Sequence, residues 1–97
     1  MNQAIVNTIQ EYFKTKPVAK AWVFGSFARG EERADSDVDI MVHLLPGVKM
    51  GLAFCGMICD LEDALGRRVD LVREGCLKPF ARESVEHDKI LVYERAN

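Results

Sequence analysis

The apolar residues of this 97-residue chain follow two spacings in turn, and this alternation constrains the fold more than any other feature. The four-residue spacing of Ile5, Ile9 and Phe13 predicts a first helix, because it places the three side chains on one face. The same kind of spacing predicts a second helix at about residues 50–65, and Pro79 suits the first turn of a third helix that runs to about His87.

Between the helical segments lie short stretches of β-prone residues. They span residues 19–24, 37–44, 68–72 and 89–93. In the second stretch, Val38, Ile40 and Val42 point to one face of a strand, and Asp37 and Asp39 point to the other. This order predicts an α/β (α+β) fold, a small mixed sheet of about four strands with helices packed on it, and leaves the parallel and antiparallel pairings open.

Length and composition are those of a single domain that spans residues 1–97. Apolar residues make up 48% of the chain and charged residues 29%, which is typical of an ordinary globular protein. A net charge of −2 argues against nucleic-acid binding through a general basic field. Because so small a domain buries a modest share of its surface, an oligomer or a protein partner would add to its stability.

The N-terminus and the cysteines predict a cytoplasmic protein. There is no signal-peptide pattern, and no apolar run approaches the roughly 20 residues that a bilayer requires. Three cysteines without Cys-x-x-Cys spacing predict neither a disulfide framework nor a zinc site, and Cys55 and Cys59 are expected in the core. The helix that carries them has further apolar residues that belong either to the core or to a surface for a helical partner: Met50, Phe54, Met57 and Ile58.

The stretch after the first predicted strand has the features of an anion site. Gly25 lets the backbone approach a ligand closely, and Ser26, at the start of a short helix, offers a hydroxyl beside backbone N–H groups. Arg29, one turn later, can reach a phosphate oxygen. A Gly-Ser pair by itself is more often a turn with a helix cap, so its weight depends on what accompanies it.

Three aspartates accompany the Gly25-Ser26 pair. Asp37 and Asp39 leave the same face of a predicted strand, with Cα atoms roughly 6.5–7 Å apart, and Asp70 faces outward on the strand at 68–72. Three carboxylates suit Mg²⁺, and two such ions serve an in-line phosphoryl displacement. The alternative is that the Asp-x-Asp pair arose by chance on an exposed strand, and that Asp70 is a salt-bridged residue at a strand edge.

Together these residues resemble a known family. Gly25-Ser26, a gap of ten residues and Asp37-Val38-Asp39 are similar to the signature of the DNA polymerase β-like nucleotidyltransferases. Ala28-Arg29-Gly30 and Ser36 resemble the minimal nucleotidyltransferase (MNT) branch, whose members are single domains of about this length. The resemblance covers nearly the whole chain and implies the nucleotidyltransferase fold.

The resemblance also assigns roles to the residues. It implies that Gly25, Ser26 and Arg29 bind the nucleotide. It implies that the catalytic residues, which also bind two Mg²⁺ ions, are Asp37, Asp39 and Asp70. The expected reaction is transfer of AMP from ATP to a tyrosine hydroxyl of a HEPN-domain toxin, with the MNT protein acting as antitoxin and as partner in a complex. A protein acceptor explains the lack of an acceptor-binding domain.

Two other functions stay open. The chain is alternatively a non-catalytic antitoxin that neutralises its partner by complex formation, in which case replacing an aspartate leaves protection intact. It is alternatively a small-molecule adenylyltransferase of the antibiotic-modifying kind, which is disfavoured because a chain of this length has little room for a closed acceptor pocket unless a dimer builds one. A plain α/β domain with an accidental motif is the least favoured interpretation.

Overall fold

The computed structural model describes residues 2–31, 33, 36–49, 51–77 and 79–96. Helices and strands follow one another in the order α1 (Gln3–Phe13), β1 (Val18–Phe24), α2 (Gly25–Ala28), β2 (Val38–Leu44), α3 (Leu52–Leu65), β3 (Val69–Arg73), α4 (Pro79–Asp88) and β4 (Ile90–Glu94). The bounds of each predicted strand differ from these by at most one residue. The alternation of helix and strand predicted from the hydrophobic spacing is therefore confirmed.

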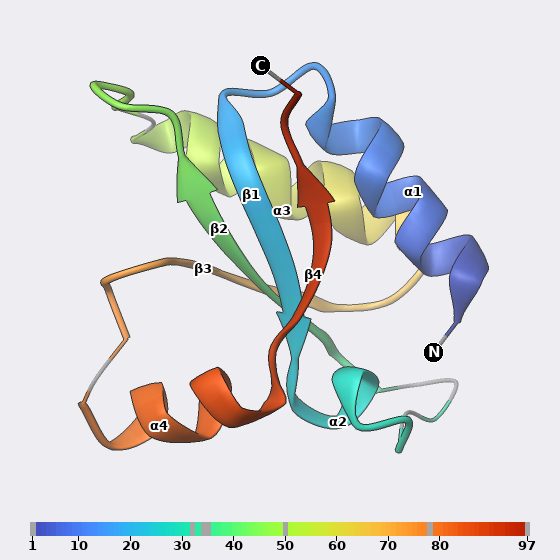
Figure 1. Ribbon diagram of the computed structural model, residues 1–97. Coiled ribbons are helices and arrows are strands. Elements are labelled where there is room, and N and C mark those ends of the chain that lie inside the picture. The colour runs from blue at the N-terminus through green and yellow to red at the C-terminus, as the bar shows by residue number, and fades with distance from the viewer. Residues whose placement is uncertain (1, 32, 34–35, 50, 78, 97) are drawn as a thin grey trace.

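The strands form one mixed sheet in the order β3-β2-β1-β4. β1 pairs antiparallel with both β2 and β4, whereas β2 and β3 are parallel. A parallel pair needs a crossover, and α3 provides it between β2 and β3. α1 and α3 pack on the same face of the sheet, while α2 and α4 lie at the end where β1 finishes (Figure 1).

The core lies between the sheet and the two long helices. Ile9 and Phe13 of α1, Val23 of β1, Ile40 of β2 and Leu61 of α3 are all fully buried. Alternation along the strands places every second side chain in this core, so the intervening side chains face away from α1 and α3. On β2 this second set includes Asp39, which is half-buried.

The expectation that Cys55 and Cys59 lie in the core is wrong. Both are exposed free thiols, as is Cys76. The buried stripe of α3 contains Met57 and Leu61, with partly buried neighbours that complete it at Phe54, Ile58 and Leu65. Cys55 and Cys59 each follow a stripe residue by one position, and the rotation of about 100° per helical residue turns them toward solvent.

The same stripe decides between the two roles expected for the apolar residues of α3. Met57, Phe54 and Ile58 pack into the core rather than forming a separate surface for a partner, and Met50 lies outside the described residues. The large apolar side chain that α3 exposes among the described residues is Leu52, at 90%. Across the described ranges, no helix is long and apolar enough to span a membrane.

Candidate functional site

The site begins at the turn between β1 and α2. Gly25 has a φ of +69°, a left-handed conformation that glycine adopts without steric cost. Phe24, just before it, pairs with Asp39 of β2, so the turn lies beside that aspartate. A Cβ atom on Gly25 would overlap Asp39 Oδ2. Both the backbone conformation and the close approach of this carboxylate therefore require glycine.

The parallel pairing of β2 and β3 brings two of the predicted aspartates side by side. Asp39 and Asp70 are direct Cα partners in the register, and Asp37 immediately precedes β2. Burial, together with the negative charges of Asp70 and Asp37, raises the pKa of Asp39 to about 6, and Arg29 opposes this rise. The negative charges of Asp70 and Asp37 thus disfavour ionisation of Asp39, and a nearby cation would relieve this repulsion.

The carboxylates do not form a closed ligand set as they stand. Within the part of the chain that the structure describes, no three His, Cys, Asp or Glu side chains are grouped closely enough to hold a metal ion. Their chemistry nevertheless fits Mg²⁺, which prefers hard oxygen ligands, takes few protein ligands and keeps several waters. The crowding of charge around Asp39 is the observation that supports this fit.

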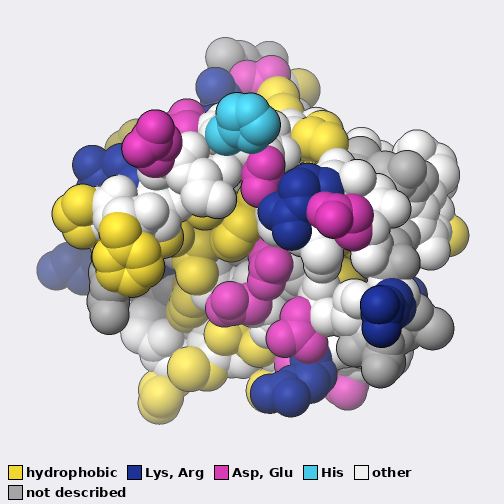
Figure 2. Space-filling model, turned by 90° about the horizontal axis from the view of Figure 1, so that it is seen from below, with side chains coloured by type: hydrophobic (Ala, Val, Ile, Leu, Met, Phe, Trp, Pro, Cys, Tyr) yellow, Lys and Arg dark blue, Asp and Glu magenta, His cyan; other side chains and the backbone are white. Residues whose placement is uncertain are grey.

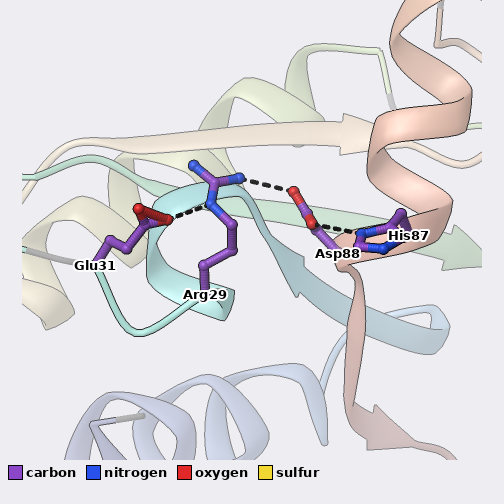
Figure 3. Close-up of polar contacts among 4 residues, drawn as sticks. All are labelled: Arg29, Glu31, His87 and Asp88. Atoms are coloured by element: carbon purple, nitrogen blue, oxygen red, sulfur yellow. Dashed lines mark hydrogen bonds and ion pairs between the residues drawn. The ribbon is translucent and has the colours of Figure 1, made fainter.

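Arg29, at the end of α2, is held by two carboxylates. Its Nε donates a hydrogen bond to Glu31, and its Nη1 donates to Asp88 Oδ2 at 2.7 Å. Asp88 is the last residue of α4, and its other oxygen, Oδ1, lies 3.2 Å from His87 Nδ1. Figure 3 shows the four side chains in a row, with the arginine between the two acids. The network joins α2 to α4 across the end of the sheet.

A pocket of about 340 Å³ opens between α2 and α4. Three of the residues predicted from the sequence line it, namely Gly25, Arg29 and Asp39, whereas Ser26, Asp37 and Asp70 lie outside its lining. Figure 2, which views this end of the molecule, shows acidic side chains grouped across the middle of the face, with apolar side chains on one flank.

The second wall of this pocket was not predicted from the sequence. α4 contributes Phe80, Ala81, Ser84, Val85 and Asp88, and the last residue of β1, Phe24, lies beside them. No local signal identifies these residues, because α4 meets α2 only through the tertiary fold. The one available hint was charge, since Asp88 is an acid at a helix end and complements the single arginine of the motif.

A family model, described as polymerase beta nucleotidyltransferase, matches residues 7–97. The chain therefore belongs to this nucleotidyltransferase family, and the resemblance seen in the motif is confirmed. A candidate protein adenylyltransferase of Methanocaldococcus jannaschii is 39% identical over 85 residues, which cover 87% of this chain and 83% of that protein. The protein adenylyltransferase MntA of Thermococcus cleftensis is 40% identical over 77 residues, which cover 77% of this chain and 75% of that protein.

Solved structures share the fold. A toxin–antitoxin crystal structure with AMP-PNP contains a chain that matches with a TM-score of 0.78 at 22% identity, covering 98% of this chain and 75% of that one. A tri-AMPylated HEPN toxin of Shewanella oneidensis in complex with its MNT antitoxin gives a TM-score of 0.72 at 21% identity, covering 98% and 74%. At these identities the likeness concerns the fold, and it confirms the predicted nucleotidyltransferase fold.

Proposed function

We propose that this chain is an ATP-dependent protein adenylyltransferase that acts as the antitoxin of a HEPN-type toxin. The observation that carries the proposal is the close approach of Gly25 to the Asp39 carboxylate in the lining of a pocket that also includes Arg29. This combination of a tight glycine turn, the Asp39 carboxylate and the Arg29 guanidinium suits a nucleoside triphosphate. The names of the relatives, protein adenylyltransferases, support protein as the acceptor class.

In this proposal the two halves of the motif have different tasks. Gly25, Ser26 and Arg29 bind the phosphates, since the turn presents backbone N–H groups and the guanidinium offers parallel donors. The ligands of Mg²⁺ are Asp37, Asp39 and Asp70. When bound, the metal would neutralise the negative charge that develops on the phosphate oxygens.

The reaction forms one bond and breaks one. A tyrosine hydroxyl oxygen of the toxin attacks the α-phosphorus of ATP, and the bond from that phosphorus to the oxygen bridging it to the β-phosphate breaks, so that pyrophosphate leaves. We assign the hydroxyl proton to the Asp70 carboxylate, which is exposed and lies in register with Asp39. Catalysis then depends mainly on alignment and on charge stabilisation.

The test is a transfer assay with the protein encoded by the gene next to that of this chain, which the proposal expects to be a HEPN-type toxin. The purified pair is incubated with ATP and Mg²⁺, and the intact mass of the HEPN protein is measured. The expected result is a gain of one or more AMP groups that is lost with Asp39→Asn and retained with Asp63→Asn, an exposed acid on α3. A mass that stays unchanged with the wild-type chain would refute the proposal.

A second function, neutralisation of the toxin by binding alone, has one observation in its favour. The three aspartates are not gathered into a ligand set among the described residues. If this function is correct, Asp39→Asn still forms a stable complex and still protects cells from the toxin. We place the protein in the cytoplasm, and the three exposed free thiols support a reducing compartment.

A further inference from the structure

Asp88, the last residue of α4, lines the pocket between α2 and α4 although it lies outside the sequence motif. Its carboxylate lines the pocket, and its Oδ2 accepts a hydrogen bond from Arg29 Nη1 at 2.7 Å. Only 13% of the Asp88 side chain is exposed, against 47% for Arg29. The aspartate is thus the more enclosed member of the pair, and it restricts where the longer and more flexible arginine can point.

The second partner of Arg29 is placed differently. Glu31 lies in the loop after α2, and 61% of its side chain is exposed. Arginine carries five N–H donors in a planar fork. With Nε directed to Glu31 and one Nη1 proton directed to Asp88, the described residues leave the other proton of Nη1 and both protons of Nη2 for a ligand. Release of the exposed Glu31 would free one more donor, whereas release of Asp88 would free the whole side chain to rotate.

We propose that Asp88 is a positioning residue, which holds the Arg29 guanidinium at the pocket so that its remaining N–H groups face the phosphates of ATP. This rests on the proposed function, because it assumes that Arg29 binds phosphate. His87 reinforces the arrangement through Asp88 Oδ1, so that both carboxylate oxygens are engaged (Figure 3). Glu31 acts in the opposite sense and competes with the nucleotide for Arg29.

The experiment measures nucleotide affinity apart from transfer. Binding of AMP-PNP with Mg²⁺ is followed by calorimetry for the wild type, Asp88→Asn, Arg29→Ala and the double variant, with KM and kcat measured on the HEPN acceptor. Asp88→Asn is expected to weaken AMP-PNP binding about tenfold and to raise the KM for ATP similarly, with kcat changed by less than about threefold. In the Arg29→Ala background the same change is expected to have no further effect, because Asp88 acts through Arg29.

Two further variants make the test specific. Glu86→Gln removes a charge from the same helix, where Glu86 pairs with Lys89 at 2.9 Å, and is expected to leave AMP-PNP affinity unchanged. Glu31→Gln is expected to increase AMP-PNP affinity, because a competitor of the nucleotide for Arg29 is removed, and a loss of affinity would contradict that role. A structural effect of Asp88→Asn would appear as an equal loss of affinity with and without Arg29, and that result overturns the proposal.

The outcomes also separate this inference from the proposed function. If the wild type binds AMP-PNP with the expected pattern among variants but transfers no AMP, the proposed function fails and the role of Asp88 stands. If AMP is transferred while Asp88→Asn binds AMP-PNP as the wild type does, the role of Asp88 fails and the function stands. A wild type that does not bind AMP-PNP overturns both.

Discussion

Replacement of Asp39 by asparagine is expected to stabilise the metal-free protein at neutral pH and to abolish its activity. In the folded chain, burial and the charges of Asp70 and Asp37 raise the pKa of Asp39 from the ordinary 3.8 to about 6. The folded state therefore holds a proton on this carboxyl between about pH 4 and pH 6, where the unfolded state has already lost it. The contribution of Asp39 to stability is therefore fully present below about pH 4 and is lost as the pH rises from about 4 to about 6.

The magnitude follows from that difference in pKa. At about 1.36 kcal/mol per pKa unit, the rise from 3.8 to about 6 corresponds to roughly 3 kcal/mol for a fully shielded group. Asp39 is only half-buried, and screening by solvent halves this figure to about 1.5 kcal/mol. For a domain of this size, Asp39→Asn should therefore raise the Tm by about 6–12 °C at pH 7.5.

Thermal unfolding followed by circular dichroism in EDTA measures this effect. The wild type, Asp39→Asn and the control Asp63→Asn are compared at pH 4 and at pH 7.5. The gain for Asp39→Asn should be present at pH 7.5 and nearly absent at pH 4, and Asp63→Asn should lie within about 0.5 kcal/mol of the wild type at both. A gain that is the same at both pH values, or a loss of stability at pH 7.5, would refute the reasoning.

Gly25→Ala should reduce unfolding free energy by about 2–4 kcal/mol and AMP transfer by more than about 100-fold, because the new Cβ adds a clash to an unfavourable backbone conformation. Gly47→Ala has a similar φ of +78° with open space around it, so chemical denaturation should show a loss of only about 1 kcal/mol; equal losses would show that the clash is unimportant. Phe27→Ala, at the fully buried position of α2, should cost about 3–5 kcal/mol in urea unfolding, and a loss below 1 kcal/mol would contradict this packing. Burial and the hydrogen bond to Asp60 raise the pKa of Tyr12, so a spectroscopic titration should find its phenol protonated at a pH that ionises a free tyrosine, and Tyr12→Phe should remove that late step.

Local patterns were sufficient for the helices, the strands and three of the nine residues that line the pocket. The buried stripe of α1 follows directly from the four-residue spacing of Ile5, Ile9 and Phe13. Asp39 is fixed on the face opposite Ile40 because side chains alternate along a strand. Gly25 is likewise recognisable from sequence, since the tight turn after a short strand admits few other residues.

Cysteine placement shows where local patterns fail. Cys55 and Cys59 share the apolar character of their neighbours on α3, and hydrophobicity alone did not separate them from the stripe that contains Met57. The separation depends on the exact rotation of the helix against the sheet. Only packing against the core defines that rotation, so two thiols expected inside are exposed.

The sequence by itself determined which elements form, in what order, and which residues of the motif share a strand face. Only the tertiary structure decided that β3 pairs parallel with β2, which places Asp70 opposite Asp39, and that α4 closes the pocket with Asp88 against Arg29. The physical reason is the range of the interactions. Helix and strand periodicity are properties of neighbouring residues, whereas Arg29 and Asp88 are 59 positions apart and meet only after the sheet has assembled.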